Sequence, residues 1–170
     1  MKDIKQLGIP IIILIIADQL IKILIHNYFF DMNFTIINHV LQFHPTINRN
    51  LSWLGNYIEI LSNPIVTILL NVAVIIIYIS GYNYYRSKTS SVGKYANFIL
   101  ITGLSGSICS FVDKVFWGGS LDYIHIPNFF IFDLKDCYIN ISLLFFCYFA
   151  IKYNKEIKLM DYLRFCFRCK

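Results

Sequence analysis

Long apolar runs separated by short polar segments dominate this chain of 170 residues. A helix needs roughly 20 mostly apolar residues to cross the hydrocarbon core of a bilayer. Four runs are long enough, at about 7–25, 64–85, 95–117 and 130–151. Segment 26–63 lies between the first two runs, and residues 152–170 follow the last. We therefore predict one integral-membrane α-helical domain over residues 1–170, built as a bundle of four transmembrane helices.

The first run resembles the start of a cleaved signal peptide, because Lys2 and Lys5 precede it. It continues through Asp18 and Lys22, however, and no small-residue cleavage site follows. We therefore interpret it as a retained span. The composition agrees, because 57% of the residues are apolar and only 15% are charged, against roughly 45–50% and 25% in soluble domains. These fractions argue against a disordered chain, a secreted disulfide scaffold and most cytosolic enzymes.

Basic residues gather on one side of the predicted bundle. Eleven of the fifteen Lys and Arg residues fall at the N-terminus, in the link between the second and third runs, or in the tail. By the positive-inside rule, both termini and the tail are cytoplasmic, and segment 26–63 lies outside. Seven of the ten acids then fall in spans or on the outer side, so we expect an active site near the extracytoplasmic face. The net charge of +5 then indicates contact with anionic membrane lipids and not with nucleic acid.

Two parts of the outer segment have a pattern of their own. Residues 33–43 include Phe, Thr, Ile and Val, which are typical of strands. We expect residues 52–61 to form a short interfacial helix, with Trp53 and Tyr57 as anchors. The histidines have no metal-ligand spacing, and the chain contains no His-Glu-x-x-His motif. We therefore expect neither a metal ion nor another cofactor.

Ionisable residues within apolar spans are expensive and are therefore candidates for function. Asp18 and Lys22 lie four residues apart in the first span, which puts them on one helical face with the acid first. This spacing predicts an ion pair that faces the interior of the bundle. Two interpretations remain open, a purely structural pair and direct contact with a substrate.

A second group of acids lies where the third span ends and the fourth begins. Gly118 and Gly119 predict a break that lets the chain turn back, so the ends of these two spans should meet. The charged residues there are four acids and two lysines, Asp113, Lys114, Asp122, Asp133, Lys135 and Asp136. Two carboxyl groups close together in a low dielectric cannot both ionise easily, so such a pair divides into an acid and a base. The alternative is a set of helix caps, and we favour that interpretation for Asp133.

In these acidic segments the chain resembles lipoprotein signal peptidase, or signal peptidase II, a family of bacterial intramembrane aspartic proteases. Five short blocks match that family in order, namely Asp18-Gln19-x-x-Lys22, 48–53, 106–114, 119–124 and 132–136. The resemblance implies that Asp122 and Asp136 form the catalytic dyad. It implies substrate-binding or supporting positions at Asp18, Lys22, Asn48, Ser110, Asp113 and Lys114. We add Asp133 and Lys135 to this group, because they lie beside the implied dyad.

Several positions mark the chain as a divergent member. Ser110 and Asp133 stand where the family pattern has Asn, and Lys114 stands where it has Arg. Lys135 replaces a small residue beside the implied dyad. The resemblance also implies a small extracytoplasmic β-cradle, built from the outer segment between the first and second helices.

The function that the resemblance implies is removal of signal peptides from diacylglyceryl-modified prolipoproteins in the bacterial cytoplasmic membrane. The expected partners are these substrates and membrane lipids, and the expected state is a monomer. Two alternatives stay open. One is a small proton- or cation-coupled transporter that uses the acids as a relay. The other is an inactive paralogue that only binds lipoproteins.

Overall fold

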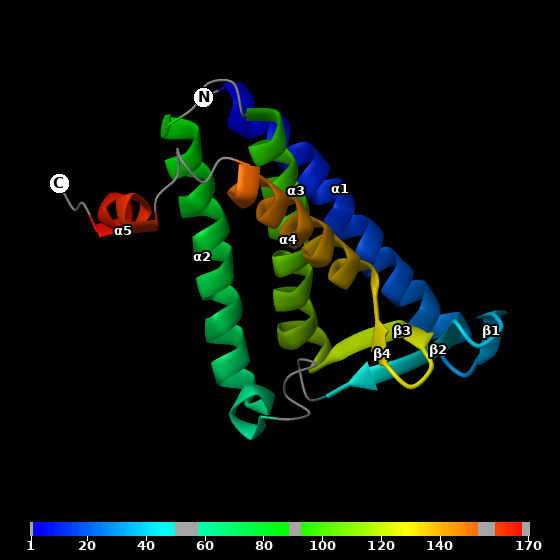
Figure 1. Ribbon diagram of the computed structural model, residues 1–170. Helices are drawn as coiled ribbons and strands as arrows, with labels where there is room; N and C mark the ends of the chain where they lie inside the picture. Colours follow the sequence, from blue (N-terminus) through cyan, green and yellow to red (C-terminus); the bar gives the residue numbers. More distant parts are fainter. Residues whose placement is uncertain (1, 50–57, 89–92, 153–158, 168–170) are drawn as a thin grey trace.

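The computed structural model describes residues 2–49, 58–88, 93–152 and 159–167. Four of its helices are long and apolar enough to cross a membrane. They are α1 (Lys2–Leu24), α2 (Pro64–Lys88), α3 (Gly93–Val112) and α4 (Leu134–Lys152). Single π-helical turns extend α1 as η1 (Ile25–Phe29) and α3 as η4 (Asp113–Trp117). The predicted transmembrane fold is thereby confirmed (Figure 1).

Helix α3 is the centre of the bundle, because it packs against α1, α2 and α4. The outward faces are apolar, as Ile65 at 70% exposure and Leu144 at 69% illustrate. Such faces suit a lipid surrounding. Close packing of α3 and α4 depends on Gly106, where an added Cβ would lie 2.6 Å from Ile139 and 3.0 Å from the Lys135 carbonyl oxygen. Small residues of this kind let transmembrane helices approach closely.

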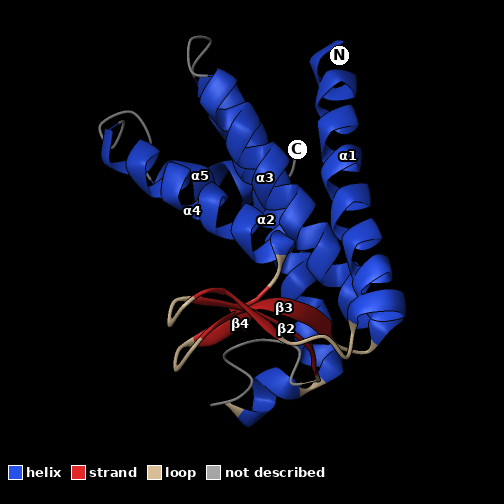
Figure 2. Cartoon of the chain, turned by 90° about the vertical axis from the view of Figure 1, so that its right-hand side faces the viewer, coloured by secondary structure: helices blue, strands red, loops and turns tan. Residues whose placement is uncertain are grey.

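A small antiparallel sheet covers one end of the bundle (Figure 2). Its strands, in spatial order, are β1 (Phe34–Ile37), β2 (Leu41–Asn48), β3 (Ser120–Ile126) and β4 (Phe130–Phe132). The family resemblance implied such a cradle from the outer segment alone, but β3 and β4 come from the connection between α3 and α4. That connection is a hairpin and not a simple turn, and α4 begins at Leu134 instead of near residue 130.

The side chains of β3 alternate between two faces, as a strand requires. Leu121 and Tyr123 pack in an apolar cluster with Ile25 from η1. Ser120 and Asp122 therefore point the other way, and both are buried. The strand thus turns its apolar face to η1 and the end of α1, and its polar face to η4 and the start of α4, which is how Asp122 reaches the site described below.

The predicted break at Gly118 and Gly119 is present, and each glycine has its own reason. Gly118 ends η4 in the left-handed conformation with φ of 61°, which glycine adopts without steric cost. Gly119 lies against β2, where an added Cβ would be 2.9 Å from the carbonyl oxygen of Asn48. The missing side chain lets Ser120 pair with Asn48 in the sheet.

Two predictions for the outer segment are met only in part. The strands reach from Phe34 to Asn48, farther along the chain than the predicted 33–43. The predicted helix at 52–61, with Trp53 and Tyr57, lies mostly outside the described residues, and the described portion is a single 3-10 turn at Glu59–Ser62. The tail contains a helix that the sequence analysis did not predict, α5 (Leu159–Phe167).

Candidate active site

Charged side chains converge where α1, η4, β3 and the start of α4 meet. The cluster contains five acids and two lysines, Asp18, Lys22, Asp113, Asp122, Asp133, Lys135 and Asp136. The structure therefore brings together all the acids that the sequence placed in two separate groups. Burying so many carboxyl groups is tolerable only if each is paired, hydrogen-bonded or protonated.

Lys22 lies at the centre of the most deeply buried part of the charged cluster. Its Nζ atom lies 2.9 Å from Asp18 Oδ2, 2.6 Å from Asp113 Oδ2 and 2.7 Å from Asp133 Oδ2. The lysine side chain is fully buried. The predicted Asp18–Lys22 ion pair is therefore confirmed, and it is wider than predicted, because the same ammonium joins α1 to η4 and to the start of α4.

Hydrogen bonds use most of the remaining capacity of these inner acids. The second oxygen of Asp18 accepts a bond from the backbone N–H of Lys135 at 3.1 Å, so α1 helps to cap α4. Gln19 Nε2 donates to Asp18 Oδ2 and to Asp113 Oδ1, both at 3.1 Å. Its Oε1 accepts a bond from Trp117 Nε1 at 3.2 Å. Asp18 and Asp113 thus orient the parts of the site and are themselves fully engaged.

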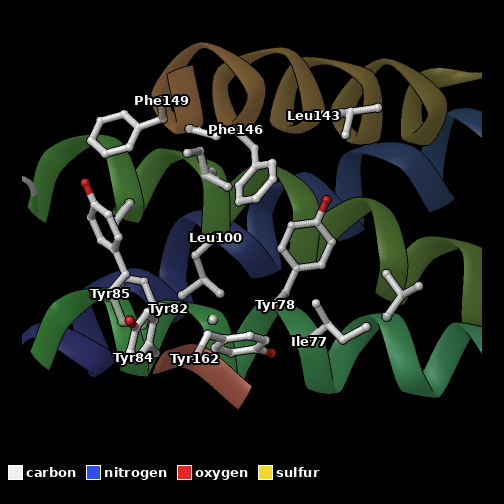
Figure 3. Close-up of a pocket in the computed structure, with 15 residues that line it drawn as sticks. Ile77, Tyr78, Tyr82, Tyr84, Tyr85, Leu100, Leu143, Phe146, Phe149 and Tyr162 are labelled. Carbon is white, nitrogen blue, oxygen red and sulfur yellow. The ribbon is translucent and has the colours of Figure 1, made fainter. Parts of the chain in front are cut away.

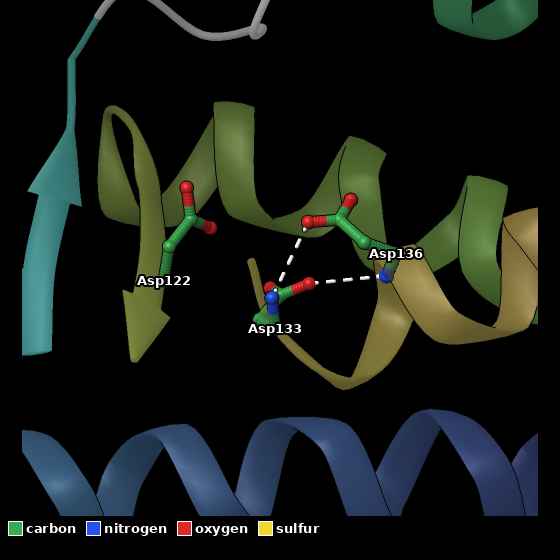
Figure 4. Close-up of side chains that lie close together, drawn as sticks. All are labelled: Asp122, Asp133 and Asp136. Carbon is green, nitrogen blue, oxygen red and sulfur yellow. Dashed lines mark hydrogen bonds between the residues drawn. The ribbon is translucent and has the colours of Figure 1, made fainter. Parts of the chain in front are cut away.

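Asp133 and Asp136 form a reciprocal cap on the first turn of α4 (Figure 4). The N–H of Asp136 donates to Asp133 Oδ1 at 3.1 Å, and the N–H of Asp133 donates to Asp136 Oδ2 at 3.3 Å. This is the geometry of a capping box, with carboxylates at both positions. The capping interpretation of Asp133 is confirmed. The cap also fixes Asp136, and leaves its Oδ1 directed toward the cluster.

Asp122 approaches from the sheet, opposite this cap (Figure 4). One carboxyl oxygen from each of Asp122, Asp133 and Asp136 lies within 4.8 Å of the others. Ser120, two residues before Asp122 on the same strand face, donates to Asp122 Oδ1 at 2.6 Å. The Asp122 side chain is 8% exposed, whereas that of Asp136 is 33% exposed. Asp136 therefore marks the side from which a substrate can reach the two carboxyl groups.

Lys135 extends into the middle of these carboxyl groups. Its Nζ lies 2.5 Å from both Asp133 Oδ2 and Ser120 Oγ. It lies 3.6 Å from Asp122 Oδ1 and 3.8 Å from Asp136 Oδ1. The spacing of the three carboxylates would suit a metal ion, but the ammonium already supplies positive charge at that position. The residues present therefore fit a metal-free site better than a metal centre.

The pKa values of the two acids of the cluster that lie outside the spans are shifted in opposite directions. Burial raises the pKa of Asp122 above its ordinary value, although Lys135 and the Ser120 hydroxyl act in the opposite direction. Burial would raise the pKa of Asp133 as well, but Lys135 and Lys22 outweigh it and hold that pKa below its ordinary value. Asp133 is therefore a fixed anion, while Asp122 is suited to carry and release a proton.

Three predicted residues lie at the margin of the cluster. Ser110 and Lys114 form a polar group of their own, because Lys114 Nζ donates to Ser110 Oγ at 2.6 Å. Asn71 from α2 also donates to that oxygen, at 2.9 Å. Asn48 is the last residue of β2 and pairs with Ser120 across the sheet. These residues thus lie beside the cluster, on the side of α2 and on the side of the sheet.

The sequence analysis missed two partners of the acids. Ser120 bonds both Asp122 and Lys135, and Gln19 bridges Asp18 and Asp113. The i, i+2 spacing of Ser120 and Asp122 would have indicated a shared face, but only once the segment had been recognised as a strand. Gln19 belongs to the matched first-span block, which gave no indication that it contacts η4.

A cavity of about 610 Å³ lies at the other end of the bundle, between α2, α3, α4 and α5 (Figure 3). Its lining is mostly apolar and aromatic, with residues such as Tyr78, Leu100 and Phe149. None of the clustered acids or lysines lines it. A large apolar cavity is the usual first candidate for a binding site, but the clustered carboxyl groups lie at the opposite end of the bundle.

A family model for signal peptidase (SPase) II matches residues 10–152. The match includes most of the first span, the other three spans and every member of the charged cluster. The chain belongs to the signal peptidase II family. It is therefore an aspartic peptidase of a bacterial membrane, from a family that acts on the signal peptides of lipoproteins.

Solved structures support the fold of this signal peptidase II relative. One bacterial membrane enzyme, determined by the in meso method at 2.3 Å resolution, superposes with a TM-score of 0.73 and 19% identity, covering 92% of this chain and 93% of its own. Another, determined by the same method at 1.9 Å, has a TM-score of 0.67 and 21% identity, covering 88% and 94%. A search of curated proteins found no match.

Proposed function

We propose that Asp122 and Asp136 are the catalytic dyad of this peptidase, and that its substrates are diacylglyceryl-modified prolipoproteins. One observation carries the proposal. Two carboxyl groups from separate elements, β3 and α4, come within 4.8 Å of each other at the partly exposed edge of the cluster. The inner acids Asp18 and Asp113 are held by Lys22 and by Gln19, so they are not free to exchange protons with a substrate.

The reaction needs one proton on the dyad. The ionised carboxylate takes a proton from a water molecule, whose oxygen then bonds to the scissile carbonyl carbon. The protonated carboxyl donates to the carbonyl oxygen, so a tetrahedral diol forms. One carboxyl group then donates a proton to the leaving nitrogen while the other carboxylate takes a proton from a diol hydroxyl, the C–N bond breaks, and the dyad is again singly protonated. The raised pKa of Asp122 supports this scheme, because it favours retention of one proton by the pair.

Charge distribution along the chain supports an orientation for this reaction. Eleven of the fifteen basic residues fall at the helix ends opposite the sheet or in the tail, which places both termini in the cytoplasm by the positive-inside rule. The sheet and the dyad then lie near the extracytoplasmic face. A prolipoprotein would enter laterally, with its signal helix in the bilayer. We expect the chain to act as a single-domain monomer among membrane lipids.

The arrangement of polar residues favours a peptidase over a transporter. A proton relay would need polar side chains that lead from the cluster to the inner end of the bundle. Along α3, the hydroxyl groups of Thr102, Ser105 and Ser107 donate to backbone carbonyls of their own helix. The inner end contains the apolar cavity described above. These contacts give a proton no continuous path among the described residues.

The test is conversion of a lipid-modified prolipoprotein to its mature form, followed by gel shift in cells that depend on this chain for processing. We expect Asp122→Asn and Asp136→Asn each to abolish conversion, with the protein level unchanged. Asp31→Asn is the matched control, because Asp31 is an exposed acid outside the cluster, and it should process normally.

Each outcome of this assay has a defined meaning. Full processing by either dyad variant would remove that residue from the proposed mechanism. Failure of the unaltered chain to process any lipid-modified precursor would contradict the proposed activity.

A further inference from the structure

Lys135 has an unusual position for a lysine beside a pair of carboxyl groups that must exchange a proton. Its side chain is only 6% exposed, and its Nζ lies 3.6 Å from Asp122 Oδ1 and 3.8 Å from Asp136 Oδ1. The two distances are nearly equal. The ammonium therefore acts on both members of the proposed dyad and not on one alone.

The ammonium is also held in place. Two of its three N–H groups are used in short bonds, to Asp133 Oδ2 and to Ser120 Oγ, both at 2.5 Å. Its backbone N–H is bound by Asp18 in α1 at 3.1 Å. Asp113 Oδ2 lies 3.4 Å from the same Nζ atom, and the nearest oxygens of the dyad follow at 3.6 and 3.8 Å. A lysine fixed in this way contributes a constant charge with little loss of conformational entropy when a substrate binds.

Charged groups face Lys135 from every element packed against it. They are Asp18 and Lys22 from α1, Asp113 and Lys114 from η4, Asp122 from β3, Asp133 before α4, and Asp136 within α4. Lys22 is saturated by three inner acids, and Lys114 is bonded to Ser110. Among the described residues, Lys135 is thus the cation in direct ion-pair contact with the dyad.

We propose that Lys135 is a positioning residue whose ammonium, clamped by Asp133 and Ser120, sets the pH range in which the dyad holds a single proton. This inference rests on the proposed function, because it needs Asp122 and Asp136 to be the reacting acids. The cation favours ionisation of both carboxyl groups, so it moves the active range to lower pH. Asp133, at a similar distance from the dyad, opposes that effect.

Lys135 and Asp133 have opposite charges, so removing one or the other should move the pH profile in opposite directions. An opposite charge within about 4–6 Å shifts a carboxyl pKa by about 1–3 units. Removal of the cation in Lys135→Gln should therefore move the whole pH profile of kcat/KM to higher pH by about one unit or more. Removal of the anion in Asp133→Asn should move it to lower pH, while the Asn side chain preserves the helix cap.

The experiment compares four variants of the full-length protein in detergent, with a diacylglyceryl-modified precursor peptide as the probe. Besides the two single variants, Asp133→Asn/Lys135→Gln loses one charge of each sign, and its profile should lie between those of the single variants. Lys135→Arg keeps the charge and should keep the profile of the unaltered protein. A merely structural lysine would lower kcat at all pH values without moving the profile.

Two results would overturn the inference while leaving the proposed dyad intact. One is a Lys135→Gln profile that coincides with that of the unaltered protein. The other is loss of activity at every pH in both Lys135→Gln and the double variant, because the ammonium would then be needed for more than its charge. Processing by Asp122→Asn or Asp136→Asn would instead reject the proposed function itself.

Discussion

Two lysines belong to the same charged cluster but have different surroundings. Lys22 is fully enclosed, and its Nζ contacts three carboxylates at 2.6–2.9 Å, from three separate elements. Lys135 makes two short bonds, to Asp133 and Ser120, and lies at 3.6 and 3.8 Å from the partly accessible dyad. Both lysines contact Asp113 and Asp133, but Lys22 is fully enclosed by carboxylates, whereas Lys135 leaves Asp122 and Asp136 incompletely paired.

This difference indicates that the two lysines have different roles, Lys22 in stabilising the fold and Lys135 in the reaction. Acids that are saturated by a cation have no reason to change their protonation state during a reaction. Acids at a longer distance from a cation keep the freedom to gain and lose a proton. The Lys22 group therefore holds α1, η4 and α4 in register, and the Lys135 group adjusts the reacting pair. Variants that affect one group and not the other should separate the two effects.

The largest effect is expected from Lys22→Met. Removal of this ammonium leaves Asp18, Asp113 and Asp133 as buried carboxylates without their shared partner, and breaking a buried ion pair in this way costs about 3–5 kcal/mol. Thermal unfolding of the purified protein in detergent should show a large drop in midpoint. Lys88→Met is the control, because Lys88 is exposed at the end of α2. An unchanged unfolding midpoint for Lys22→Met would contradict the claim that Lys22 stabilises the packing of α1, η4 and α4.

A smaller but specific effect is expected from Gly119→Ala. The added methyl group would lie 2.9 Å from the Asn48 carbonyl oxygen, so β2 and β3 must separate and Asp122 must shift. A displacement of about 1 Å at a reacting group can cost about 100-fold in rate, so the initial rate of cleavage should fall strongly.

The control for this glycine is Gly81→Ala. No atom lies within 4 Å of the position of a Cβ at Gly81 in α2, and alanine is the better helix former by about 1 kcal/mol. Its cleavage rate should be unchanged and its stability equal or higher. Equal rates for the two alanine variants would show that the contact between β2 and β3 does not position Asp122.

The smallest effects are expected at the cavity end of the bundle. The buried hydroxyl of Tyr84 has no hydrogen-bond partner among the described residues, whereas the Tyr82 hydroxyl donates to Asn97 Oδ1 at 2.7 Å. Tyr84→Phe should be neutral or slightly stabilising, and Tyr82→Phe should lose about 1 kcal/mol. Unfolding midpoints test this pair. Both variants should cleave the substrate at the normal rate. A large loss of activity in Tyr84→Phe would indicate that the cavity end takes part in catalysis, which would contradict the account.

The features that follow from local spacing could be predicted from the sequence. The four spans follow from the length of the apolar runs, and the Asp18–Lys22 pair follows from helical periodicity. The cap at Asp133 follows from its place before an apolar run. Each of these depends on residues that are neighbours in the chain, so the physics that decides them can be read within a window of a few residues.

The features that depend on distant contacts could not be predicted in the same way. Strand β3 forms because it pairs with β2, some seventy residues earlier in the chain. Without that pairing, Ser120 and Asp122 read as part of a glycine-containing turn. The burial of Lys135 was equally hidden, because a lysine in the first turn of a helix is ordinarily solvated. Only the meeting of α1, β3 and η4 around it encloses the side chain.

The central claim is that Asp122 and Asp136 together hydrolyse the substrate, and purified protein gives its most direct test. The measurement is mass spectrometry of the products formed from a diacylglyceryl-modified precursor peptide, with the unaltered protein, Asp122→Asn, Asp136→Asn and Asp31→Asn compared at equal folded concentration. We predict the cleaved signal peptide from the unaltered protein and from Asp31→Asn, and no product above background from either dyad variant. Product formed at the unaltered rate by Asp122→Asn or by Asp136→Asn would contradict the claim.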